Sequence, residues 1–152
     1  MSANQRLSEL GITLPAVATP AGAYVPAVVS GNLVFTAGQI PLVDGKLVAT
    51  GKVGKDLTAE QGKEIARVCA LNAVAAVKSV LGDLDRVKKI VKVVGFVASD
   101  ASFTQQPAVV NGASELLEQI FGEKGIHARS AVGVAVLPLD APVEVELIVE
   151  FV

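Results

Sequence analysis

Cysteine, histidine and aromatic residues are scarce in this chain of 152 residues. It has one Cys, one His and no Trp, and aromatic residues make up 4% of the total. A structural zinc site needs about four Cys, His or carboxylate ligands, and a disulfide framework needs several paired cysteines. We therefore expect no metal site and no disulfides. A lone Cys is typical of a reducing compartment, so the sequence predicts a cytoplasmic protein.

An excess of charge of one sign is also absent. The chain has 13 basic and 15 acidic residues, for a formal net charge of −2. Such a balance creates no field that would attract a polyanion, and no stripe of basic and aromatic residues is present to stack single-stranded nucleic acid. We expect small-molecule partners and no nucleic acid.

No charged residue occurs between Gly11 and Val43, a run longer than the ~20 residues of a membrane helix. Four prolines and several glycines interrupt this run, which excludes a membrane helix. The first ten residues lack the basic and apolar regions of a secretory signal, and we expect none. Because 51% of the residues are hydrophobic, we expect apolar surface to be buried between subunits.

The size and patterning predict a single α+β domain over residues 1–152. A short polar start and an extended arm occupy residues 1–20. The expected order is strand, strand, short strand, helix, strand, helix, strand, strand, with both helices on one face of a mixed sheet. The ranges are Tyr24–Val29, Asn32–Ile40, Lys46–Val48, Thr58–Gly82, Arg86–Val97, Pro107–Phe121 and two strands that begin at Arg129 and Val143.

Three features that suggest chemistry have simpler structural interpretations. Cys69 lies in the apolar stripe of the first long helix, which favours a buried hydrophobe over a nucleophile. Asn72 lies on the same face and is expected to bond backbone groups or another buried polar group. The segment Gly51–Lys55 has glycines and lysines but lacks the spacing of a phosphate loop.

The last two strands carry the leading site candidate. From Val143 the residues alternate, so that one face is apolar and the other presents Glu144 and Glu146. Arg129 opens the preceding strand, and a turn from Pro138 to Pro142 predicts a hairpin that brings Arg129 and Glu144 to neighbouring edges of one sheet. From spacing alone, Arg129 is equally consistent with a ligand clamp and with a structural ion pair at a subunit contact.

Several motifs together resemble one known family. They are Gly22-Ala23-Tyr24, the run from Gly31 to Pro41, Ala128-Arg129-Ser130, Leu137-Pro138 and Val143-Glu144. In this order they resemble the RidA/YjgF family, also labelled endoribonuclease L-PSP, over nearly all of the chain from Tyr24 to Val152.

This resemblance implies a chorismate-mutase-like α+β fold and a homotrimer with clefts between subunits. It also implies hydrolysis of reactive enamines and imines, such as 2-aminoacrylate, to 2-keto acids and ammonia, without a cofactor. Arg129 would clamp the substrate carboxylate and Glu144 would handle water and protons. Tyr24 and Gly38 would shape the cleft. His127, where many relatives have proline, would either line the cleft as a substrate-binding residue or belong to a loop.

Two positions depart from the family pattern. Ala37 stands where deaminases of this family often carry serine, and Ala131 stands where they often carry cysteine. Both changes remove polar groups near the cleft. A non-catalytic module that binds small carboxylates therefore remains an alternative to the enzyme. The third possibility, RNA cleavage, finds no phosphate track in this acidic chain.

Overall fold

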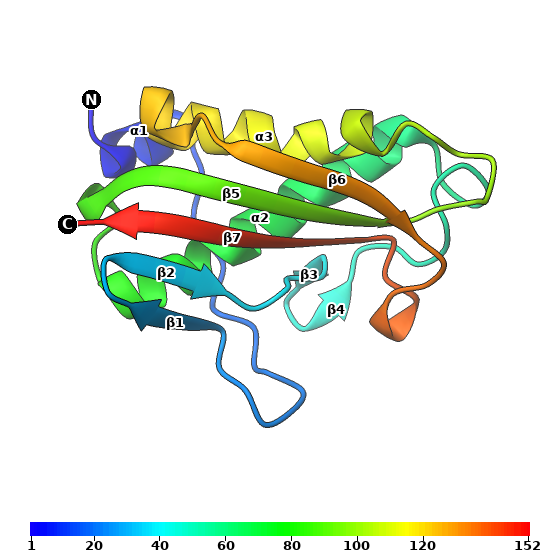
Figure 1. Ribbon diagram of the computed structural model, residues 1–152, viewed down its shortest axis with the longest axis horizontal. Helices are drawn as coiled ribbons and strands as arrows, with labels where there is room; N and C mark the ends of the chain where they lie inside the picture. The colour runs from blue at the N-terminus through cyan, green and yellow to red at the C-terminus, as the bar shows by residue number, and fades with distance from the viewer.

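A five-stranded sheet forms the base of the fold, with the strands in the order β1-β2-β7-β5-β6 (Figure 1). The computed structural model describes residues 1–152. All neighbouring strands are antiparallel except β5 and β6, which are parallel. The strands are β1 Ala27–Ser30, β2 Leu33–Thr36, β5 Val87–Ala98, β6 Ala128–Val134 and β7 Val143–Phe151, while β3 Leu42–Val43 and β4 Lys46–Leu47 form a separate hairpin.

Two long helices, α2 Ala59–Leu81 and α3 Gln106–Phe121, begin and end close to the predicted residues. Thr58 caps α2, because its side chain accepts a hydrogen bond from the Gln61 backbone while the Gln61 side chain accepts one from the Thr58 backbone. Gly82 ends α2 with a φ of 78°, a conformation that favours glycine. The capping signals in the sequence therefore locate this helix correctly.

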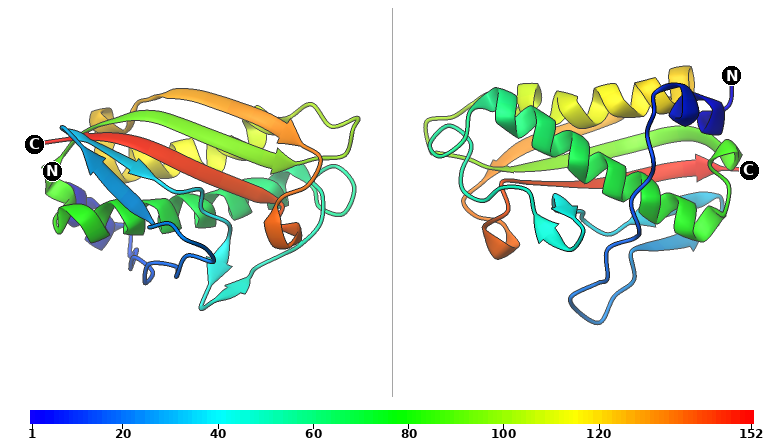
Figure 2. Two further views of the ribbon diagram at one scale, coloured as in Figure 1. Left: turned by 60° about the horizontal axis from the view of Figure 1, so that its bottom comes forward. Right: turned by 180° about the vertical axis from the view of Figure 1, so that it is seen from behind.

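Both helices cover the same face of the sheet, as Figure 2 shows from behind. The alternation along β7 explains this arrangement, since the side chains of every second residue point at the helices. Four of them, Val143, Val145, Leu147 and Val149, are at most 1% exposed. Burying such a side chain is worth about 1.5–3 kcal/mol, so this face of β7 anchors the core. The predicted α+β fold with helices on one face is confirmed.

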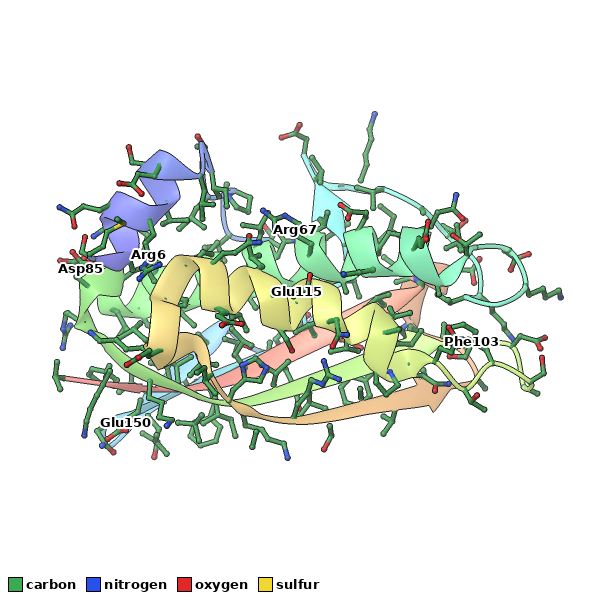
Figure 3. All side chains as sticks on the ribbon, turned by 90° about the horizontal axis from the view of Figure 1, so that it is seen from above. Arg6, Arg67, Asp85, Phe103, Glu115 and Glu150 are labelled. Atoms are coloured by element: carbon green, nitrogen blue, oxygen red, sulfur yellow. The ribbon has the colours of Figure 1, made fainter.

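Polar contacts join the outer surfaces of the two helices. The Lys63 ammonium lies 3.1 Å from the Glu115 carboxylate, and the Arg67 guanidinium donates to the Gln119 side chain at 3.1 Å. Figure 3 shows Arg67 on α2 and Glu115 on α3. Exposed pairs of this kind contribute little to stability, about 0–1 kcal/mol each.

The opposite face of the sheet carries no helix (Figure 1). Its apolar side chains are partly exposed: Val28 is 50% exposed, Phe35 is 38% and Val132 is 45%. Register places Phe35 beside Ile148 on β7, and Val132 beside Phe96 on β5, so apolar side chains lie on this face on both sides of the acidic residues of β7. We call this surface, with the acidic side chains of β7, the open face.

One predicted strand pairing is wrong. The last two strands do not form a hairpin, because β5 lies between them and pairs with β6 on one side and β7 on the other. Strand β5 is 12 residues long, and both its edges need hydrogen-bond partners. Helix α3 carries the chain back so that β6 runs parallel to β5, and β7 then takes the other edge.

The N-terminal region also differs from the prediction. A short helix, α1 Ala3–Glu9, replaces the expected irregular start, and a capping box between Ser2 and Gln5 begins it. The following arm crosses α2 in Figure 2, and its Ile12 and Leu14 pack against the core. Strands β1 and β2 are shorter than predicted. No helix of the fold combines the length and the apolarity needed to cross a membrane.

Candidate active site

Glu144 is a half-buried carboxylate on the open face, near the start of β7. Burial raises the pKa of Glu144, and the negative charge of Glu146 on the same strand raises it further. A carboxyl group whose pKa is raised toward neutrality is suited to accept and return a proton.

Gly38 provides the space that the Glu144 carboxylate occupies. A Cβ built on Gly38 would lie 2.8 Å from Glu144 Cδ, closer than real Cβ contacts. The segment is fixed there by two hydrogen bonds between Gln39 and Val145, with N···O distances of 2.8 and 3.0 Å. Strand β2 ends at Thr36, yet the chain continues beside β7 and holds Gly38 against Glu144.

Tyr24 and Gly38 line one pocket of about 100 Å³, together with Leu139 from the turn before β7. Tyr24 lies ahead of β1 in a segment without regular structure and is 54% exposed. The structure thus brings Tyr24, Gly38 and Glu144 to one region, which we call the acidic half-site.

Arg129 lies on the other side of β5, near the start of the edge strand β6. Its Nη1 donates to Asn111 Oδ1 at 2.7 Å and to Ser114 Oγ at 3.2 Å, both on α3. The guanidinium is therefore held by neutral acceptors and forms no salt bridge within the chain. Its charge is available to an anion.

His127 lies two residues before Arg129 and is partly buried. Its Nδ1 lies 2.6 Å from the Gly125 carbonyl oxygen, and its Nε2 lies 2.8 Å from Ser114 Oγ. Both ring nitrogens thus have partners inside the chain. Because Ser114 also contacts Arg129, we call Arg129, His127, Ser114 and Asn111 the basic half-site.

Arg129 and Glu144 do not meet within one chain, which corrects the predicted hairpin site. Arg129 pairs with Val93 of β5, whereas Glu144 pairs with Phe96, three residues further along. Residues three apart on a strand point to opposite faces, and two strand spacings with three residues of rise separate the Cα atoms by about 14 Å. Arg129 accordingly reaches α3, while Glu144 lies on the open face.

Asn111 and Ser114 were missed as site residues by sequence reasoning. In the sequence, the apolar stripe of this helix consists of Val109, Ala113, Leu116 and Ile120, and it predicts that Asn111 lies on the outer side. Asn111 is instead partly buried and bonded to Arg129. The sequence does contain a signal for this polar cluster, because Asn111 and Ser114 are three residues apart and therefore lie on one side of the helix.

Cys69 contributes no nucleophile to either half-site. It is fully buried on α2, and its thiol donates to the Val143 carbonyl oxygen at 3.4 Å. Burial, and secondarily the charge of Glu144, raise the pKa of the Cys69 thiol well above its usual range. Asn72, on the same helix, donates to the backbone oxygens of Ile40 and Leu42, as expected. No three His, Cys, Asp or Glu side chains gather to hold a metal ion.

Known proteins share this fold and sequence over nearly the whole chain. A family model described as "YjgF/chorismate mutase-like, putative endoribonuclease" matches residues 4–151. Protein TCP17 of Trypanosoma cruzi is 51% identical over 145 residues, which cover 95% of this chain and 91% of that protein.

Two further relatives extend the comparison. A 2-iminobutanoate/2-iminopropanoate deaminase of Salmonella typhimurium is 38% identical over 84% of this chain and 86% of its own length. The crystal structure of Atu1372 from Agrobacterium tumefaciens, described as having unknown function, matches with a TM-score of 0.91 and 46% identity over 99% of this chain and 92% of that one. The matched fold, the nearly complete family match and these identities together place the chain in the RidA/YjgF family.

Proposed function

We propose that this protein hydrolyses reactive enamines and imines of the 2-aminoacrylate type to 2-keto acids and ammonia. The observation that carries the proposal is the half-buried carboxylate of Glu144, whose pKa is raised by burial and by Glu146. A relative named as a deaminase of 2-imino acids, 38% identical to this chain, supports the same chemistry. The lone reduced Cys69 is consistent with a cytoplasmic setting for this activity.

The complete site forms between two copies of the chain in this proposal. The acidic and basic half-sites are about 14 Å apart and on opposite faces of the sheet, so no small substrate bridges them within one chain. The open face exposes apolar side chains of Val28, Phe35 and Val132, which is typical of surface that a partner covers. A homotrimer would bring the basic half-site of one copy to the acidic half-site of the next, with three equivalent clefts.

Arg129 holds the substrate by its carboxylate. The guanidinium is planar and permanently charged, and it matches a carboxylate through two parallel hydrogen bonds. Hydrogen bonds to a charged group are worth about 1.5–3 kcal/mol. Tyr24 and Gly38 form the wall of the cleft on the acidic side, and His127 lines it on the basic side. No cofactor takes part in this scheme.

Glu144 handles the protons of hydrolysis. As a carboxylate it accepts a proton from the attacking water, while the water oxygen bonds to the carbon of the protonated imine and the C=N π electrons move to nitrogen, which becomes a neutral amine. The protonated Glu144 then returns that proton to the nitrogen. With this proton the nitrogen is an ammonium group, so the C–N bond breaks and ammonia leaves, while the Glu144 carboxylate takes the hydroxyl proton and completes the keto group. A raised pKa suits both steps, because the acid form is populated closer to neutral pH.

A non-catalytic carboxylate-binding protein is the second candidate function. It is favoured by Ala37, adjacent to Gly38, and by Ala131, two residues after Arg129, where the family's deaminases often carry polar residues. Such a protein keeps the Arg129 clamp and needs no proton transfer. The two functions therefore differ at Glu144.

The test is formation of 2-keto acid when the purified protein is added to imines generated in situ by an amino-acid oxidase. We expect acceleration over the spontaneous rate, lost in Arg129→Ala and in Glu144→Gln. Matched controls are Arg67→Ala and Glu150→Gln, since Arg67 bonds only Gln119 on the outer surface and Glu150 pairs with Lys88 on the same strand face as Glu144. If the protein accelerates hydrolysis of none of the imines but binds 2-keto acids in a way that needs Arg129, the enzymatic function is refuted and the carboxylate-binding function is supported.

A further inference from the structure

We infer that Ser114 and His127 are positioning residues for Arg129, and that they select which edge of its guanidinium is offered to a ligand carboxylate. The inference rests on the proposed function, because it takes Arg129 as the carboxylate clamp. It adds a specificity element outside the acidic half-site. The geometry behind it is a chain of four hydrogen bonds that runs through α3 and the turn before β6.

When His127 is neutral, the donors and acceptors in these four hydrogen bonds have only one consistent assignment. The Gly125 carbonyl oxygen can only accept, so His127 Nδ1 carries the proton over their 2.6 Å contact. Nε2 is then unprotonated and accepts from the Ser114 hydroxyl at 2.8 Å. The oxygen of Ser114 consequently turns its lone pairs toward Arg129 Nη1, which donates at 3.2 Å.

Both hydrogens of Arg129 Nη1 are occupied by this arrangement, one by Ser114 and one by Asn111 at 2.7 Å. Nε and Nη2 form no hydrogen bond within the chain. The Nη1–Nη2 end of the guanidinium is therefore closed to a bidentate ligand, while the Nε–Nη2 edge has no hydrogen-bond partner within the protein. A planar carboxylate binds that edge through two parallel hydrogen bonds.

His127 gives Ser114 its direction. A serine inside a helix otherwise turns its hydroxyl proton toward the carbonyl oxygen of the preceding turn. With Nε2 of His127 as a fixed acceptor, the hydroxyl of Ser114 stays aligned and the Arg129 side chain is ordered before a ligand arrives. Because the side chain is already ordered, ligand binding no longer loses the conformational entropy of immobilising it.

The first test measures binding of 2-oxobutanoate by calorimetry. Ser114→Ala is expected to weaken Kd about three- to tenfold, the effect of ordering one long side chain. Ser114→Thr, which keeps a hydroxyl, is expected to retain wild-type affinity within about twofold. Ser79→Ala is the matched control, because the Ser79 hydroxyl lies on α2 and bonds only the Ala76 carbonyl oxygen. In turnover, Ser114→Ala should raise KM by the same factor and leave kcat nearly unchanged.

A double variant tests whether the two residues act as one unit. His127→Leu removes the acceptor of Ser114 and should weaken Kd as much as Ser114→Ala does. Both changes break the same series of hydrogen bonds to Arg129. The double variant Ser114→Ala/His127→Leu should therefore bind 2-oxobutanoate no more weakly than either single variant. Fully additive losses would show two independent contacts and would overturn the positioning role.

Nuclear magnetic resonance can determine directly which ring nitrogen of His127 carries the proton, because His127 is the only histidine in the protein. The ¹⁵N spectrum of the ring should show the proton on Nδ1, and Ser114→Ala should shift the Nε2 signal. A proton on Nε2, or an unchanged Kd in Ser114→Ala, would overturn the inference. If Arg129→Ala still binds 2-oxobutanoate, Arg129 is not the carboxylate clamp and the proposed function fails with it. If binding is lost in Arg129→Ala but unchanged in Ser114→Ala, only the positioning role is refuted.

Discussion

Replacing Gly38 with alanine should separate catalysis from stability. The added methyl would lie 2.8 Å from Glu144 Cδ, while ordinary contacts begin at 3.4 Å, so the carboxyl group must retreat by about 0.6 Å at Cδ and further at its nearer oxygen. Displacements of about 1 Å in a catalytic group can cost about 100-fold in rate. We therefore expect kcat for imine hydrolysis to fall by about that factor.

The fold should tolerate the same change. Gly38 has no positive φ, so alanine fits its backbone, and the group displaced is the end of a flexible side chain. Gly→Ala at a compatible position stabilises by about 0.4–1 kcal/mol through the unfolded chain, which offsets part of the displacement. Chemical denaturation should give a stability within about 1 kcal/mol of wild type.

A double-mutant cycle provides the control. In a Glu144→Ala background the carboxylate is gone and the new methyl has room, so Gly38→Ala should have little further effect on the residual rate. If Gly38→Ala lowers kcat about 100-fold in both backgrounds, or does not lower kcat in the wild-type background, Gly38 does not act through Glu144.

Three further predictions follow from the same geometry. Arg129→Lys keeps the charge but loses the planar fork, and Kd for 2-oxobutanoate measured by calorimetry should weaken about 10- to 100-fold; an unchanged Kd would exclude bidentate binding. The pKa of Glu144 is raised in the folded state, so the folded protein binds that proton more tightly than the unfolded chain and stability falls as pH rises from the ordinary glutamate range through the raised pKa. Glu144→Gln should therefore raise Tm at pH 8, with a gain that shrinks toward pH 4, and an equal gain at both pH values would contradict this cause. The Cys69 thiol is fully buried with a raised pKa and should resist Ellman's reagent at pH 8 until the protein unfolds, so rapid labelling of the native protein would refute its burial.

Local signals in the sequence predict the helices and the core strand well. The capping pair of Thr58 and Gln61 and the stop at Gly82 locate α2, and the alternation from Val143 identifies which face of β7 is buried. These features depend on a few neighbouring residues, so they are readable without the rest of the fold. The capping pair of Ser2 and Gln5, which begins α1, was equally local and was overlooked.

Strand order was beyond the reach of local signals. The turn from Pro138 to Asp140 is consistent with a hairpin, yet the edges of β5 determine where β6 and β7 lie. Which strand completes an edge depends on the whole sheet. Arg129 and Glu144 were both singled out from the sequence, but the prediction that they are neighbours in one chain failed for this reason.

The partners of Arg129 illustrate a second limit. A helical stripe reports which residues are apolar, so it places the polar Asn111 on the surface and says nothing of Ser114. They face Arg129 only because β6 packs as an edge strand beside α3. Such contacts between distant segments become visible only in the folded structure.

Subunit complementation tests the central claim, that the site joins Arg129 of one copy to Glu144 of another. Arg129→Ala and Glu144→Gln, each inactive alone, are refolded together in equal amounts and assayed for 2-keto acid formation from imines. In a symmetric ring each cleft takes one residue from each of two neighbours, so about a quarter of the clefts should contain both native side chains and activity should return to about that fraction. A mixture that assembles like wild type and stays inactive would contradict the shared site.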